Sequence, residues 1–234
     1  MRWIIIICLL LGLELCFLAR GSRAGGVKLS GMLNLPSRGA PGNRRDSAAS
    51  RGDCPNSGES LTALVPETGF GLTHKLYPDF LFYIPYASEK IFAQFSLVDG
   101  AGNIIDRQTI DLPDTAGIIR VRVGGDKGLK EVDKIYLWRF QIVCGPAGTP
   151  LRQVRGGIQR VQLKLENIPP EQRLEIYYNN GLWFDYLTQL TFLKLQQPDN
   201  TSLSEQWRDL LKVVGLENID DKKLLTCCDR DTVR

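Results

Sequence analysis

Two acidic residues, Glu67 and Asp185, are the best candidates for acid–base chemistry in this sequence. Enzymes that hydrolyse glycosidic bonds use two carboxyl groups that lie within about 10 Å of each other. The spacing in the chain does not show whether these two meet. Glu67 follows a proline, which favours a turn contact, and Asp185 follows Trp183 by two residues, which favours a helix cap or an ion pair. We expect a non-catalytic role, with a hydrolase that uses this carboxylate pair as the alternative.

His74 is the only histidine, so no site can combine two imidazoles. Zinc sites and catalytic triads would depend on this one ring. It lies in segment 72–75, which we interpret as a loop or strand edge, and we expect a surface residue. We predict no metal site and no cofactor.

Tyrosines are the best candidates for ligand binding. Tyr77, Tyr83 and Tyr86 lie in an aromatic segment, and aromatic rings can form a face that binds sugars. Side chains alternate between the two faces of a strand, so half of these rings must point into the core. The partners that we consider are an envelope protein or a glycan.

The first 24 residues have the layout of a secretory signal peptide. Arg2 precedes an apolar run over 4–18, and small residues follow at 19, 21, 22 and 24. The run is shorter than the roughly 20 residues that a membrane-spanning helix needs. We therefore expect export to the periplasm or the extracellular space. The alternative is an uncleaved helix that anchors the protein, which would be its only membrane contact.

Export changes the interpretation of the six cysteines. Two of them lie in the leader, and an even number in the remaining chain indicates disulfides. A bond between adjacent cysteines is strained, so we expect one bond from each of the two earlier cysteines to one of the last two, with both such pairings left open. The four residues are Cys54, Cys144, Cys227 and Cys228.

Charge argues against nucleic acid as a partner. The leader carries three basic residues and one acidic residue, so the rest of the chain has a net charge near +1. Basic residues concentrate in segment 25–56, a linker rich in Gly, Ser and Arg. This arm has the charge to contact anionic lipid or glycan, although a solvated linker is the favoured interpretation. Its arginines are Arg38, Arg44, Arg45 and Arg51.

The middle of the chain, 57–167, has the pattern of a β-sandwich. Short runs of alternating apolar residues are separated by Gly, Pro and Asp turns. Segment 135–144 alternates most clearly, and the face that carries Tyr136, Trp138 and Phe140 is the core candidate. The predicted strands cover 80–85, 91–98, 104–112, 118–123, 135–144 and 157–165.

Helical periodicity replaces alternation from residue 168 onward. Pro170 and Glu171 indicate a helix start, Gly181 a break, and Pro198 the end of a second helix. Thr201–Ser202 is the predicted cap of a third helix, which buries a stripe that includes Leu203 and Trp207 and ends at Gly215. The predicted fold class is α+β. An antiparallel, Ig-like sandwich over 57–167 precedes a helical unit over 168–228, made of an αα-hairpin plus one helix, and a disordered tail over 229–234.

A series of motifs in order along the chain resembles a known family, the domain-of-unknown-function family number 928, which is largely cyanobacterial. The resemblance covers roughly residues 38 to 228. It implies no activity, because the family has no established catalytic residues to transfer. The motifs include 61–68 (LTALVPET), 82–86 (FYIPY), 181–185 (GLWFD) and the Cys227–Cys228 pair.

Overall fold

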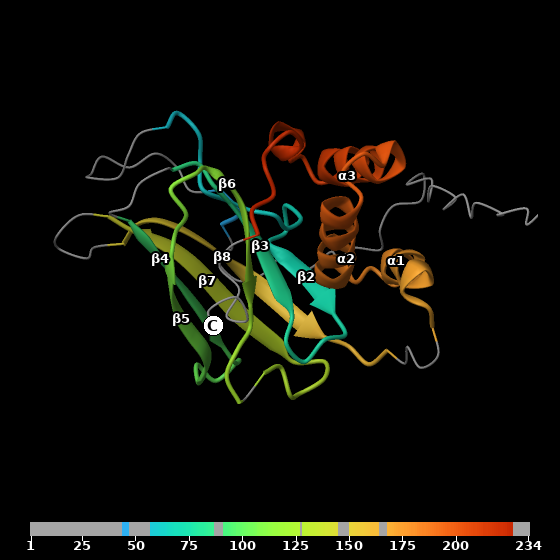
Figure 1. The fold of residues 1–234 in the computed structure, drawn as a ribbon. Helices are drawn as coiled ribbons and strands as arrows, with labels where there is room; N and C mark the ends of the chain where they lie inside the picture. Colours follow the sequence, from blue (N-terminus) through green and yellow to red (C-terminus); the bar gives the residue numbers. More distant parts are fainter. Residues whose placement is uncertain are drawn as a thin grey trace, which may run out of the picture.

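The computed structural model describes residues 44–46, 57–86, 91–126, 128–144, 150–163 and 168–226. Two β-sheets face each other, and three helices lie at one side of them (Figure 1). The α+β class predicted from the sequence is confirmed, with the strands preceding the helices as expected. Among the described residues, no helix has the length and apolar character needed to cross a membrane.

The larger sheet has five strands in the order β2-β8-β7-β4-β5. All neighbours are antiparallel except β2 and β8, which run parallel. The smaller sheet has the order β1-β3-β6 and is antiparallel. The strands are β1 (Thr62–Ala63), β2 (Phe70–Thr73), β3 (Asp79–Ile84), β4 (Phe92–Val98), β5 (Ile104–Asp111), β6 (Gly117–Arg122), β7 (Ile135–Val143) and β8 (Pro150–Arg160).

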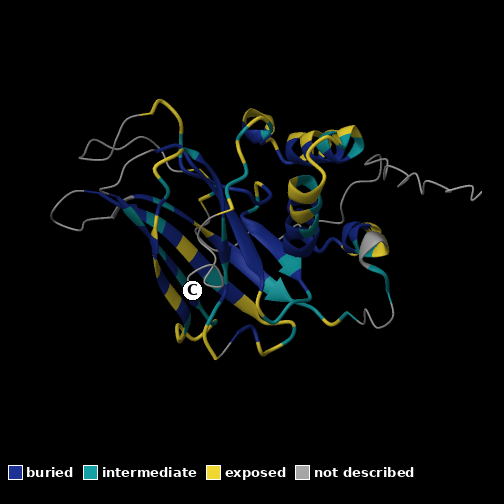
Figure 2. Ribbon diagram, in the orientation of Figure 1, coloured by how far each residue is buried: buried dark blue, intermediate teal, exposed yellow. Residues whose placement is uncertain are grey.

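The core between the sheets is aromatic. Phe80 and Phe82 of β3 pack against β4 and β7, and the rings of Phe82 and Phe140 stack with centroids 4.1 Å apart. The predicted inner face of segment 135–144 is buried, and the buried and exposed positions alternate along the strands of the large sheet (Figure 2). Burial of these rings is the main driving force for closing the sandwich.

The helical unit packs on the sheets through the start of its second helix. Phe184 reaches the aromatic core, with its ring 4.9 Å from that of Phe80, and the Trp183 indole donates to the Leu64 carbonyl over 2.9 Å. Gly71 of β2 lies beneath these two residues, where a larger side chain would collide with them. The helices are α1 (Pro170–Asn179), α2 (Trp183–Gln196) and α3 (Thr201–Val213), followed by the short 3₁₀ helix η1 (Glu217–Ile219).

Two local predictions differ from the structure. The last strand begins at Pro150 and ends at Arg160, instead of covering 157–165, because its first half pairs with β7. Arg152, a charged residue on the buried face, hid the alternation of that half. Asn200, the residue before Thr201, caps α3 by accepting a hydrogen bond from the Leu203 amide.

The cysteine prediction falls mostly outside the described residues, which do not include the leader, Cys54, Cys227 or Cys228. Cys144 follows β7, is 3% exposed and is not a free thiol. The pairing predicted from the sequence stays a prediction.

Candidate functional site

The described part of the chain brings its one histidine and a buried carboxylate together. Thr73 ends β2, which places His74 at the edge of the large sheet. Gly181, with a φ of 64°, turns the chain between α1 and α2, so that Asp185 falls in the first turn of α2. Asp185 is fully buried, and its Oδ1 lies 2.7 Å from the His74 Nδ1. Its Oδ2 accepts a hydrogen bond of 3.0 Å from the His74 backbone amide.

Aromatic and basic groups surround this pair. The imidazole stacks on the ring of Tyr177 from α1, with centroids 5.3 Å apart. Burial, and then the negative charge of Asp185, raise the pKa of Tyr177. The Arg160 guanidinium donates to the backbone carbonyls of His74 and Leu129. The pair therefore joins β2, α1 and α2, and the position that we expected to be a surface histidine is mostly buried.

The chemistry open to this pair is proton transfer. A carboxylate beside Nδ1 favours the tautomer with the proton on Nδ1, which leaves Nε2 as an acceptor. Nucleophilic catalysis would also need a hydroxyl or thiol beside Nε2. No hydroxyl or thiol of the described residues hydrogen-bonds the imidazole. The hydroxyl of the neighbouring Thr73 accepts a hydrogen bond from the Lys75 amide instead. The contacts of the His74–Asp185 pair therefore favour a structural role, in which it positions α1 and α2, over a catalytic role.

The second predicted carboxylate lies elsewhere. A Cβ atom on Gly215, which follows α3, would be 3.3 Å from the Glu67 Oε1. In the same region, Arg45 donates to the carbonyls of Val214 and Gly215. Glu67 thus lies near the residue that follows α3. Asp185, in the first turn of α2, contacts His74 instead. The contacts in the described residues do not bring the two carboxylates together, and their proposed joint role stays untested.

The three tyrosine candidates have different surroundings. Tyr77 is 37% exposed, and Tyr86 is buried. Tyr83 is also buried, with its hydroxyl donating to the Glu59 carboxylate, which accepts a 2.7 Å hydrogen bond from Lys222 on its other oxygen. These two donors lower the pKa of Glu59, with Lys222 the larger cause. The cluster borders a polar pocket of about 400 Å³.

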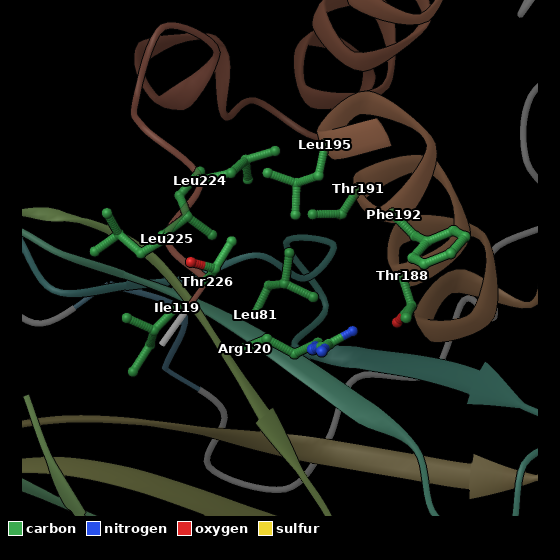
Figure 3. Close-up of a pocket in the computed structure, with 11 residues that line it drawn as sticks. Leu81, Ile119, Arg120, Thr188, Thr191, Phe192, Leu195, Leu224, Leu225 and Thr226 are labelled. Atoms are coloured by element: carbon green, nitrogen blue, oxygen red, sulfur yellow. The ribbon is translucent and has the colours of Figure 1, made fainter. Parts of the chain in front are cut away.

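An apolar groove lies between the small sheet and α2, and sequence reasoning missed it. Figure 3 shows the side chains that surround it. Its volume is about 110 Å³. The C-terminal segment, residues 223–226, forms one wall because it pairs in parallel with β6. The Ile118 amide donates to the Lys223 carbonyl, and the Leu225 amide donates to the Ile118 carbonyl. The lining residues include Leu81 from β3, Arg120 from β6, Phe192 and Leu195 from α2, and Leu224 and Leu225.

Phe192 and Leu195 of α2 are 46% and 45% exposed, although both are large apolar side chains. The sequence did contain a sign of this groove. Apolar residues occur on all sides of α2, which is more than a single buried stripe requires. Thr188 and Thr191 also line the groove, but their hydroxyls donate to the Phe184 and Leu187 carbonyls within α2. The groove wall contributed by α2 is therefore apolar in character.

Comparisons with known proteins identify a family. The family model described as Domain of Unknown Function (DUF928) matches residues 46–224, which is more than half of the chain. No curated protein matches the sequence. Within the described residues, no group of three or more His, Cys, Asp or Glu side chains is arranged to hold a metal ion.

Proposed function

The chain belongs to the DUF928 family, and we propose that it is an exported, non-catalytic binding module of the cell envelope. The observation that carries this proposal is the apolar groove beside α2. Two large apolar side chains remain about half exposed there, next to an already apolar wall. Exposed apolar patches of this kind are typical of binding sites, because covering them removes apolar area from water.

The occupant that we propose is an extended apolar segment of an envelope protein. The C-terminal segment of this chain already lies in extended form along β6, held by backbone hydrogen bonds. A partner segment would rest on Leu224, Phe192 and Leu195. Its binding would need no change in the small sheet that forms the floor of the groove.

The polar side chains that could take part in a reaction support a non-catalytic role, because each one makes contacts that hold the fold together. Asp185 links α2 to the end of β2, and Arg160 binds the carbonyls of two loops. Glu59 joins Tyr83 to Lys222 near the C-terminal end. The alternative hydrolase would need Glu67 and Asp185 to act on one bond, whereas Asp185 contacts His74 and Glu67 lies beside Gly215.

Export and cross-linking complete the proposal. The apolar leader supports secretion, and an oxidising compartment would let Cys144 form a disulfide with Cys227 or Cys228. Mass spectrometry of the purified protein, with and without reductant, measures both the cleavage of residues 1–24 and the mass change of disulfide reduction. A full-length, fully reduced chain would contradict this part of the proposal.

The binding role is tested by co-sedimentation of the purified protein with isolated envelopes of the producing cells. We expect the wild-type protein to sediment and the F192S/L195S variant to lose most of this binding. The matched control is I104S/V213S, which removes two similarly exposed apolar side chains from other surfaces. Equal binding by all three proteins, or no sedimentation of the wild-type protein, would reject the groove as the binding site.

A further inference from the structure

The register of the large sheet brings four arginines into one line on its outer face. Arg107 of β5 is opposite Ser96 of β4, which is opposite Arg139 of β7. Arg139 is opposite Arg155 of β8, and Arg155 forms an antiparallel bridge with Arg44. We call Arg107, Arg139, Arg155 and Arg44 the arginine row. Neighbouring strands lie about 4.8 Å apart, so four steps extend the row over about 19 Å.

The arginine row faces solvent. All four residues are exposed, while their neighbours in sequence on β5 and β7, such as Asp106 and Phe140, are buried. Figure 2 shows this alternation of exposed and buried positions along the strands of the large sheet. No carboxylate in the described part of the chain forms an ion pair with any of the four guanidinium groups. Asp111, the acidic residue of β5 on this face, lies two rows away, opposite Phe92.

This arrangement has an energetic cost in the unbound protein. Like charges directly opposite each other on neighbouring strands repel, and three of the arginines occupy adjacent positions. Long side chains reduce the repulsion by spreading outward, but they do not remove it. An anion that bridges the row would relieve the repulsion and add forked hydrogen bonds, since each guanidinium can bind a carboxylate or sulfate through two N–H groups.

The adjacent row adds neutral hydrogen-bonding groups. It consists of Thr109, Gln94, Gln141 and Gln153 on the same four strands, and the Gln141 amide donates to Gln94 over 2.6 Å. Amide and hydroxyl side chains both donate and accept, which suits the hydroxyl groups of sugars. A line of cations beside a line of such groups matches a polymer that carries both anions and hydroxyls.

We propose that the arginine row binds an acidic polysaccharide laid across the strands. Each sugar ring of a polyuronate carries one carboxylate, so its anions recur on the scale of the strand spacing. The line is one arginine wide, which suits a single extended chain better than the two-dimensional array of headgroups on a membrane. The inference concerns a different face from the apolar groove, and it stands whether or not that groove binds a partner.

The test measures binding of the purified protein to polygalacturonate at about 0.05 M salt, where surface charges are weakly screened, with neutral dextran as the uncharged control. We expect binding to polygalacturonate alone. The R107Q/R139Q/R155Q variant should bind at least about tenfold more weakly, because it loses three guanidinium contacts. The K130Q/K134Q/K212Q variant removes the same charge from exposed positions elsewhere and should change the affinity less than about twofold.

Three results would overturn the proposal. They are no binding by the wild-type protein, equal weakening in the two triple variants, and tighter row-dependent binding to phosphatidylglycerol vesicles than to polygalacturonate. The last result would assign the row to a membrane surface. Thermal unfolding is recorded for each variant. The arginine variant loses like-charge pairs and is expected to melt no lower than the wild-type protein, so unfolding would not account for lost binding.

Discussion

The carboxylate of Asp185 contacts His74 twice, through the imidazole Nδ1 at 2.7 Å and through the backbone amide at 3.0 Å. The two residues are 111 positions apart, and their contact joins the end of β2 to the first turn of α2. A buried carboxylate with two such partners is a structural link between the sheet and the helical unit. Its removal leaves the His74 backbone amide without its acceptor and takes the carboxylate away from the imidazole.

We predict that Asp185→Ala lowers the free energy of unfolding by about 2 kcal/mol, because that acceptor is lost from a buried position. Urea denaturation followed by tryptophan fluorescence measures the change. Asp126→Ala, in an exposed turn, is the control and should change the value by less than about 0.5 kcal/mol. Equal stability of the two variants would show that the contact with His74 contributes little.

A second prediction concerns the close approach of α2 to β2. A Cβ atom on Gly71 would lie 2.9 Å from the Phe184 Cε2 and 3.1 Å from the Trp183 Cβ. Gly71→Ala should therefore destabilise the protein by about 1–3 kcal/mol, as overpacked cores do. Gly100→Ala is the matched control, because its Cβ would meet only the Ile135 carbonyl at 3.8 Å. Thermal melts of both variants give the comparison, and a harmless Gly71→Ala would argue against tight docking of α2.

The pH dependence of stability should include a contribution from Glu59. Hydrogen bonds from Lys222 and Tyr83 lower the pKa of this carboxylate in the folded protein. The stabilisation is therefore present above the unfolded-state pKa, near 4.5, and is lost as the pH falls through the lower folded-state value. Glu59 is substantially exposed, so the contribution is below about 1 kcal/mol.

Glu59→Gln is the variant that tests this contribution. Its free energy of unfolding should fall below that of the wild-type protein at pH 7 and approach it near pH 3. Urea denaturation at the two pH values measures the difference. A difference that grows on acidification would have the wrong sign and would reject the assignment.

Removing one charge from the arginine row should raise stability. Arg139 faces Arg155 across neighbouring strands, so Arg139→Gln is expected to increase the free energy of unfolding by about 0.5 kcal/mol. Arg122→Gln is the informative contrast. The Arg122 Nε lies 2.8 Å from the buried carboxylate of Asp79, and its loss should destabilise the protein. Destabilisation by both substitutions would indicate that the row costs nothing in the free protein.

Periodicity predicted the individual elements well where one face of an element is buried. Alternation in 135–144 identified the inner face of β7, and the apolar stripe from Leu203 to Val214 identified α3, because burial on one side leaves a regular pattern in the chain. The first half of β8 was not predicted because its buried face includes the charged residue Arg152. The polar arm around Arg44 carried no periodicity, and its bridge to β8 was therefore not predicted.

The sequence by itself determined the α+β class, most strand and helix positions and the family resemblance, because these depend on residues that are near one another in the chain. Only the tertiary structure decided which distant residues meet: His74 with Asp185, Phe192 with Leu224 around one groove, and Arg155 with Arg44 on one side and Arg139 on the other. The physical reason is that strand register and helix docking are set by the packing of the whole core. A shift of one residue in register would turn the arginines of a strand to its opposite face without changing any local pattern.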